Sequence, residues 1–470
     1  MDVLIMYGVW SDQALCDWDS DMNVRMGSSD KLGDHKPENL MQPSLAGLHE
    51  RLRSLENGDA DGQEIESIKE QIRTQLPAVG TARSLPQKKT PSGRTNVLHM
   101  NYMHSQTDPS GETEIEHLRF FARTVKELGL RLEILTDEGC REELEQELSK
   151  ESFKALDYTL VIAQKPVSKW AEDSVEYLQN GQVAVLSLFD DDLLELAMKA
   201  GRQERWQGKV SPETLAEVLR DDHLWILLGT RVNALKTSLE REYAAQVRGQ
   251  QVGYIRAYIE GGNMITGEDA VGNPVILIGK DAIASTAYMY QIDDDDVRRI
   301  LCEDFGLESI EQVICVEQPG KFHLDMGMLF IGKGVVIVND SRKALKDAIE
   351  MAELAPCLTT ERMAAKLQLQ CSLEDDAAKD LQTAGLQVWR EKLEDNVFYN
   401  FFNGEFVEGA DGFSYYITNG GLQDQEERFE ALMIQEWNVV KKVFFSPQDT
   451  AQRGLQERGG VGCRLKGARL

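Results

Sequence analysis

The sequence predicts a mixed α/β fold preceded by a helical N-terminal arm. Three observations support this prediction. The 470 residues are enough for two or three ordinary domains. Hydrophobic residues make up 42% of the chain, which supports a proper core. Strand and helix patterns alternate from residue 96 onward. We therefore divide the chain into an N-terminal region (1–76), a linker (77–95) and a main domain (96–470).

The N-terminal region contains two runs of apolar residues at helical spacing, separated by Asn57-Gly58. These residues are Leu45, Leu48, Leu52, Leu55, Ile65, Ile68 and Ile72. The pattern predicts a helical hairpin or a short coiled-coil arm, which would bind a partner, mediate self-association or pack on the main domain. Residues 77–95 are rich in Pro, Gly, Ser, Thr and Lys, a composition typical of a linker.

The main domain begins with clear periodic patterns. Residues 113–128 place apolar side chains on one helical face, and Gly129 favours a helix end there. Residues 130–134 alternate between apolar and charged, which predicts a strand. Further strands are expected at 97–103, 158–163, 275–278, 313–316 and 335–338, and further helices at 341–355 and 426–440. We find no sequence repeat of fixed period.

The charge of the chain argues against one class of partner. The formal net charge is -28 at pH 7. A chain this acidic repels phosphate backbones, so we expect no nucleic-acid partner. It would attract cationic small molecules or basic protein segments. Solubility alone is also a sufficient explanation for the charge.

The cysteines and the N-terminus indicate the compartment. Seven cysteines are irregularly spaced without a Cys-x-x-Cys pair, so we expect neither a zinc site nor a disulfide framework. Free thiols favour a reducing compartment. The apolar residues 1–7 lack a basic leader and a cleavage site, and no apolar run approaches the ~20 residues that cross a bilayer. We expect a cytoplasmic protein with no membrane partner, and export by a non-classical route stays open.

Four short segments carry candidate chemistry: WAEDSVEY (170–177), IEGGN (259–263), FHLDMG (322–327) and ERGGVGC (457–463). His323 and Asp325 would share one face of a strand, so that an acid/base and a carboxylate line one site. The glycines before Cys463 let the backbone turn tightly and a substrate approach closely. Each segment alone also has a structural explanation, such as a histidine in a sheet, a thiol in a tail, a turn or a solvated loop.

Together and in this order, the four segments resemble the guanidino-group modifying superfamily. That superfamily includes arginine deiminases, agmatine deiminases, dimethylargininases, amidinotransferases and protein-arginine deiminases. The spacing Trp170-x-x-Asp173-x-x-Glu176 is most similar to the protein-arginine deiminase branch. The resemblance covers residues 96–470 and implies the pentein fold, a five-bladed pseudosymmetric α/β propeller, here preceded by the helical arm.

The resemblance implies a role for each catalytic residue. Cys463 would be the nucleophile and His323 the general acid/base. Asp173 and Asp325 would bind the guanidinium through charge-assisted hydrogen bonds. Glu260 would orient His323 and stabilise its charge. The implied reaction converts a guanidinium into a ureido group and ammonia through an S-alkylthiouronium intermediate, and it requires no metal or organic cofactor.

Trp170 and Asn263 would complete the substrate site. Three features depart from the family pattern. Glu172 stands where many relatives carry Arg or Gln, which adds negative charge near the site, and Gly462 stands where many carry His. Residues 464–466 (RLK) differ from the usual small polar residues after the nucleophile. The preferred substrate is an arginine-containing protein, which would be citrullinated. The alternatives are hydrolysis of free arginine or agmatine, amidino transfer, and a non-enzymatic role in binding a cationic partner on a degenerate fold.

The acidic run Asp293–Asp296 has two interpretations. It lacks the spaced ligands of an EF-hand loop, so calcium is the less favoured one. Aspartates complement the dipole at the start of a helix, and we expect a helix from Val297 onward. Residues 331–334 (IGKG) precede a strand, which predicts a hairpin turn there.

Overall fold

The computed structural model describes residues 44–58, 60–76, 82–103, 112–154, 157–163, 167, 169–172, 175–185, 191–220, 252–319, 323–395, 398–456 and 459–469. Its helices are α2 Leu45–Glu56, α3 Gly62–Arg73, α4 Glu112–Leu128, α5 Arg141–Lys150, α6 Asp191–Trp206, α8 Lys280–Tyr290, α9 Asp294–Phe305, α10 Arg342–Leu354, α11 Leu358–Thr383, α12 Gln423–Ala431, α13 Gln448–Gln456 and α14 Val461–Arg464. Of the helices in these ranges, none is both long and apolar enough to cross a bilayer.

The first nine strands are β1 Val97–Tyr102, β2 Arg131–Asp137, β3 Tyr158–Ala163, β4 Val175–Tyr177, β5 Val183–Val185, β6 Val252–Tyr254, β7 Met264–Glu268, β8 Pro274–Gly279 and β9 Val313–Val316. The others are β10 Met328–Gly332, β11 Val335–Asn339, β12 Gln387–Glu391, β13 Glu394–Asp395, β14 Tyr399–Asn400, β15 Gly404–Glu408, β16 Ser414–Thr418, β17 Val443–Phe445 and β18 Leu465–Ala468.

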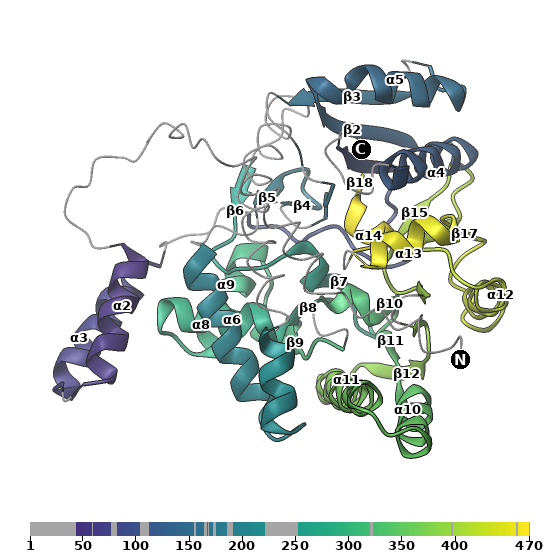
Figure 1. Cartoon of the computed structure of the whole chain (residues 1–470). Coiled ribbons are helices and arrows are strands. Elements are labelled where there is room, and N and C mark those ends of the chain that lie inside the picture. Colours follow the sequence, from purple (N-terminus) through teal and green to yellow (C-terminus); the bar gives the residue numbers. More distant parts are fainter. Residues whose placement is uncertain are drawn as a thin grey trace.

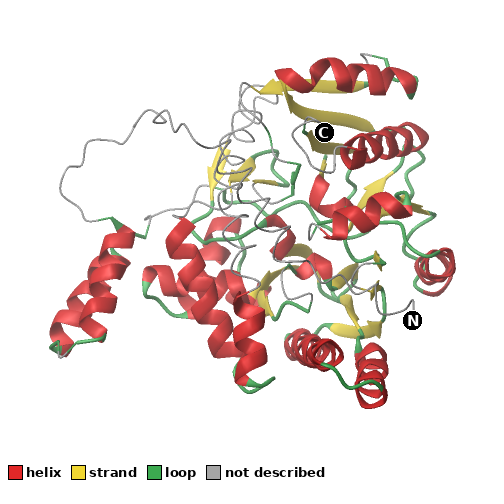
Figure 2. Cartoon of the chain, in the orientation of Figure 1, coloured by secondary structure: helices red, strands yellow, loops and turns green. Residues whose placement is uncertain are grey.

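Five sheets repeat one pairing pattern. Their strand orders are β18-β1-β2-β3, β4-β5-β6, β7-β8-β9, β10-β11-β12 and β15-β16-β17. In each of them the first two strands are antiparallel and the third is parallel to the second. The sheets lie toward the middle of the molecule and the helices lie around the outside (Figures 1 and 2). The mixed α/β fold predicted from the sequence is therefore confirmed.

The core is divided among the sheets and the helices that cover them. On the sheet of β1 and β2, for example, Leu98 and Leu132 pack with Leu118 of α4 and Leu144 of α5, all of them fully buried. Two further apolar clusters span neighbouring sheets: one joins the sheet of β7 to that of β10, and the other joins the sheet of β10 to that of β15. Burial of apolar surface therefore holds each sheet both to its helices and to a neighbouring sheet.

The helical hairpin predicted near the N-terminus is present as α2 and α3. Ser44 and Asp61 cap the two helices with their side chains. The seam between them consists of Leu48, Leu52, Ile68 and Ile72. His49 is buried and donates a hydrogen bond from Nε2 to the Met289 carbonyl on α8 (2.8 Å). The hairpin thus packs on the main domain, and a partner role for it remains a prediction.

The second half of the predicted linker differs from the expectation. Residues 82–95 run along the main domain and bond to it through their backbone. The Gln87 N–H donates to the Tyr177 carbonyl on β4 (2.8 Å), and the Lys89 N–H donates to Thr266 on β7 (3.0 Å). From residue 82 onward this segment is ordered by neighbouring strands, which composition alone does not reveal.

The predicted strands and helices of the main domain are confirmed, with shifts of a few residues at their ends. The largest difference is at the helix expected over 426–440. It begins at Gln423 as α12 and continues from Leu432 to Glu436 as a wider π-type turn. The wider turn buries both Leu432 and Met433. The chain then leaves the helix to reach β17, which explains the early end.

Two smaller predictions are also confirmed. Asp293 caps α9 by accepting a hydrogen bond from the Asp296 N–H (2.7 Å), as expected for an aspartate before a helix. Residues 332–334 turn between the antiparallel strands β10 and β11, and all three have positive φ. Positive φ favours glycine, which explains the Gly-Lys-Gly sequence.

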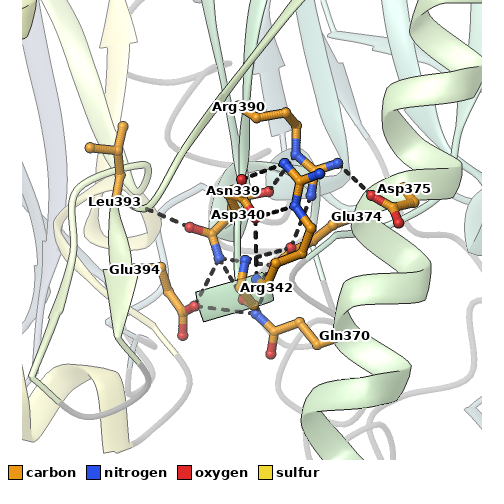
Figure 3. A network of polar contacts seen from close by, with 10 residues as sticks. Asn339, Asp340, Arg342, Gln370, Glu374, Asp375, Arg390, Leu393 and Glu394 are labelled. Atoms are coloured by element: carbon orange, nitrogen blue, oxygen red, sulfur yellow. Dashed lines mark hydrogen bonds and ion pairs between the residues drawn. The ribbon is translucent and has the colours of Figure 1, made fainter. Parts of the chain in front are cut away.

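A buried polar network ties α11 to the end of β11 (Figure 3). The Glu374 carboxylate accepts hydrogen bonds from Asn339 Nδ2 (2.9 Å), the Ser341 N–H (2.8 Å) and Ser341 Oγ (2.6 Å). Arg390 on β12 adds a longer contact of 3.2 Å. This carboxylate is fully buried and satisfied by several donors, so it holds a helix, a strand and a turn in one arrangement.

Candidate active site

The predicted site residues come from turns that enter the first strands of different sheets. Glu260 immediately precedes the 3-10 turn Gly261–Asn263, which leads into β7. His323 precedes the turn Leu324–Met326, which leads into β10. Cys463 lies in α14, directly before β18. In these three sheets, the segment that leads into the first strand thus carries one candidate site residue.

His323, Glu260 and Asp325 surround Gly262. His323 Nε2 lies 2.6 Å from Glu260 Oε2, and both side chains are buried. A Cβ atom on Gly262 would lie 2.5 Å from His323 Nδ1 and 2.9 Å from Asp325 Oδ1. Position 262 therefore needs glycine, and the backbone there lies against both side chains. The prediction that His323 and Asp325 lie on a strand was wrong, because a 3-10 turn follows His323.

Asn403, at the start of β15, connects Asp325 to Cys463. Its Nδ2 donates to Asp325 Oδ2 (2.7 Å) and to Cys463 Sγ (3.3 Å). Its Oδ1 accepts from the N–H groups of Gly462 (2.9 Å) and Cys463 (3.4 Å). Because one amide reaches both groups, the Cys463 sulfur and the Asp325 carboxylate lie side by side.

Asn419, just after β16, holds the same turn from the other side. Its Oδ1 accepts from the Val461 N–H (2.9 Å), and its Nδ2 donates to the carbonyls of Asn400 (2.8 Å) and Asn403 (3.2 Å). A Cβ atom on Gly460 would lie 2.5 Å from Asn419 Nδ2 and 2.6 Å from Asn403 Oδ1. The glycines before Cys463 therefore make room for two buried asparagines.

Sequence reasoning missed both asparagines. Each is followed by glycine, at 403–404 and 419–420, and an Asn-Gly pair ordinarily marks a turn. Asn403 directly precedes β15, the first strand of its sheet, which is also where the other candidate site residues lie in their sheets. This equivalence can be recognised only from the strand pairing in the structure.

A cluster of charged side chains lies next to the turn that carries Cys463. It consists of Lys89, Glu172, Glu176, Glu405 and Lys466. Lys466 Nζ lies 2.9 Å from Glu176 Oε1 and 3.3 Å from Glu172 Oε2, and Lys89 also pairs with Glu172. The extra negative charge expected from Glu172 is therefore matched by two lysines. Burial first, and then the charge of Glu172, raise the pKa of Glu405 to about 8.

The first predicted segment lies beside the Cys463 turn. The Glu172 N–H donates to the Cys463 carbonyl (3.2 Å). The Arg464 guanidinium lies 4.5 Å from the centre of the Trp170 ring, and a Cβ atom on Gly459 would be 2.1 Å from that ring. Trp170 thus packs against the turn. Asp173 lies outside the described residues.

Asn263 lies slightly apart from this group. It is buried, and a Cβ atom on Gly279 would be 1.9 Å from its Oδ1. Its side chain therefore lies against the end of β8, and its role in substrate binding stays a prediction. Within the described ranges, no three His, Cys, Asp or Glu side chains are grouped as metal ligands.

The comparisons with known proteins concern the fold. No family profile and no curated protein matches the sequence. Among solved structures, the chain is similar to a protein described as a candidate agmatine deiminase, with a TM-score of 0.51 and 13% identity over 82% of this chain and 96% of that chain. It is also similar to an arginine dihydrolase of the ornithine-ammonia cycle in cyanobacteria, with a TM-score of 0.35 and 10% identity over 80% of this chain and 40% of that chain.

The first match carries the conclusion, since the second has a TM-score below 0.5. At 13% identity it shows the fold: the chain has the fold of this candidate agmatine deiminase. The five-bladed arrangement that the four sequence segments imply stays a prediction. The activity of the chain is a separate question, since one fold supports many functions.

Proposed function

We propose that this protein hydrolyses the guanidinium group of a small guanidine, such as free arginine or agmatine, to a ureido group and ammonia. The observation that carries the proposal is the amide of Asn403, which contacts both Cys463 Sγ and the Asp325 carboxylate. Asp325 in turn borders Gly262 together with His323. The contacts support the proposal because the side chains that we propose as nucleophile, guanidinium-binding anion and acid/base lie close to one another.

The first half of the reaction forms a covalent intermediate. The Asp325 carboxylate accepts N–H groups of the guanidinium, and Asp173, two residues before β4 in the sequence, is proposed as the second carboxylate. The Cys463 thiolate then bonds to the guanidinium carbon to give a tetrahedral adduct. His323 donates a proton to one amino group, the C–N bond breaks, and ammonia leaves an S-alkylthiouronium on the enzyme.

The second half consumes one water molecule. His323 now accepts a proton from the water, whose oxygen bonds to the thiouronium carbon. The C–S bond then breaks and the electron pair returns to sulfur, while the remaining proton of the added water leaves to solvent, which gives the neutral ureido product. Glu260, 2.6 Å from His323, stabilises the protonated imidazole in both halves. The proposed reaction uses these side chains and no cofactor.

The substrate class differs from the one preferred in the sequence analysis. Nothing in the fold comparison supports a protein-arginine substrate, and the solved structure with this fold is described as a candidate agmatine deiminase. We therefore place small guanidines first. The repeated sheet pattern supports the five-bladed arrangement that the resemblance implies, which we include in the proposal.

The test measures ammonia and ureido product from arginine, agmatine and an arginine-containing protein, each with and without calcium. We expect equal amounts of the two products from a small guanidine and no turnover by Cys463→Ala. Cys371→Ala is the matched control, because Cys371 is a buried free thiol on α11. Turnover that persists in Cys463→Ala, or no ammonia from any substrate, contradicts the proposal. If no substrate yields ammonia, the remaining alternatives are amidino transfer and binding of a cationic partner.

A further inference from the structure

Of the two asparagines that hold the Cys463 turn, Asn403 also contacts the sulfur. We propose that Asn403 controls the ionisation of Cys463: its amide stabilises the thiolate and separates it from the Asp325 carboxylate. The catalytic meaning of this inference rests on the proposed function. The ionisation itself is a property of the protein that can be measured without substrate.

The orientation of the Asn403 amide follows from its backbone partners. The N–H groups of Gly462 and Cys463 point at one amide atom, 2.9 and 3.4 Å away. A backbone N–H can only donate, so that atom must be the oxygen. The other atom is the NH₂ group, whose two hydrogens are directed to Cys463 Sγ and to Asp325 Oδ2.

Burial and the neighbouring Asp325 carboxylate oppose ionisation of Cys463, and the two lysines of the nearby charged cluster are already paired with Glu172 and Glu176. Cys463 is 5% exposed and Asn403 is fully buried. Burial disfavours a thiolate, and so does a neighbouring carboxylate such as Asp325. A donor aimed at the charged form acts in the opposite direction, and hydrogen bonds to charged groups are stronger than neutral ones. The Asn403 amide offers one donor to each of the two anions.

Asn419 provides a matched comparison. It is also a buried asparagine that contacts the turn before Cys463, and its contacts are to the backbone of Val461, Asn400 and Asn403. Asn419→Asp keeps an oxygen for the Val461 N–H and removes the donors to the carbonyls of Asn400 and Asn403, without removing the donor to the sulfur. Asn403→Asp keeps an oxygen for the N–H groups of Gly462 and Cys463 and removes the two donors.

The experiment measures alkylation of Cys463 by iodoacetamide as a function of pH in the full-length protein, with the modified peptide quantified by mass spectrometry. We expect the wild-type midpoint to lie below about 8.5, the ordinary value of a free cysteine. In Asn403→Asp the midpoint should rise by about one to two pH units, and alkylation at neutral pH should slow about tenfold or more. Asn419→Asp should lower the melting temperature and leave the midpoint within about half a unit of wild type.

Three results would overturn the inference. One is a midpoint of alkylation at or above about 8.5 in the wild-type protein, a result that does not depend on whether any variant folds. Another is an unchanged midpoint in Asn403→Asp, or in Asn403→Ser if the aspartate variant does not fold. The third is an equal shift in the Asn403 and Asn419 variants, which would assign the effect to the shape of the turn. A shift specific to Asn403 without turnover of any guanidine would leave this inference standing and reject the proposed function. Turnover of a guanidine without a shift in the Asn403 variant would support the proposed function and reject this inference.

Discussion

The hydrogen bond between His323 and Glu260 occupies one of the two imidazole nitrogens. Nε2 is held by Glu260 at 2.6 Å, and Nδ1 lies toward Gly262 and Asp325. In the proposed reaction, Nδ1 would therefore be the nitrogen that exchanges protons with the guanidine. The carboxylate behind the ring stabilises the positive charge that forms when His323 takes up a proton.

This arrangement predicts the effect of Glu260→Gln. The amide can still hydrogen bond to His323, but it no longer stabilises the imidazolium. We expect kcat to fall about tenfold to a hundredfold, with little change in KM, since acid/base catalysis contributes about 10²–10⁴-fold and His323 itself is retained. Steady-state kinetics on the preferred guanidine measure both. Glu303→Gln, at an exposed ion pair with Arg256, should behave as wild type. A rise in KM at constant kcat would instead place Glu260 in substrate binding.

Glu405 predicts a dependence of stability on pH. The pKa of Glu405 is raised to about 8, whereas an ordinary glutamate titrates near about 4.3. Between these values the folded protein keeps a proton that the unfolded chain has lost, so stability falls as the pH rises across this window and is constant above it. Glu405→Gln removes the effect. Its melting temperature should exceed that of wild type by a margin that grows up to pH ~8, equivalent to about 1 to 3 kcal/mol. A margin that is constant from pH ~5 to ~9 would contradict this assignment.

At the scale of elements, the buried network of Figure 3 fixes how α11 sits on its sheet. Glu374 and its neighbour Asp375 both bond to Arg390, at 3.2 and 2.6 Å. The Glu374 side chain is fully buried, whereas the Asp375 side chain is 60% exposed. Two adjacent carboxylates with a shared partner therefore differ in burial and in the number of donors, because only Glu374 also accepts from Asn339 and Ser341.

This pair predicts two different costs of truncation. Glu374→Ala leaves the buried donors of Asn339 and Ser341 without their acceptor, and we expect a loss of about 3 kcal/mol. Asp375→Ala breaks a solvent-screened ion pair and should cost less than about 1 kcal/mol. Thermal unfolding of both variants measures the difference. Equal melting temperatures would show that the network contributes little to stability.

At the scale of the whole molecule, the net charge of -28 predicts how a cationic substrate arrives. An acidic surface attracts a guanidinium over a distance that salt shortens. We expect kcat/KM to fall several-fold between about 20 and 500 mM salt, with kcat nearly constant. Alkylation of Cys463 by neutral iodoacetamide should show no such trend. A salt effect of the same size on both reactions would point to a change in the protein itself.

The repetition of one sheet pattern along the chain was not predictable from the sequence. Five sheets share one pairing pattern, yet the sequence contains no repeat of fixed period. Strand pairing depends on backbone hydrogen bonds, which many sequences can form. Each sheet has its own connections and helices, so the spacing between equivalent strands varies. The individual strands at 275–278 and 335–338 were predictable, and their common plan was not.

The sequence by itself determined the element types and supplied most of the candidate site residues. Apolar spacing predicts α2, α3 and α4 because a buried helical face requires it. The order of the four segments singled out Cys463 and His323. Only the tertiary structure decided that Asn403 lies between Cys463 and Asp325, and that Lys89 and Lys466 match the charge of Glu172. These contacts join residues that are far apart in the sequence and lie on different elements. Which residues meet depends on how the sheets and the segments between them pack, and local sequence patterns do not encode that packing.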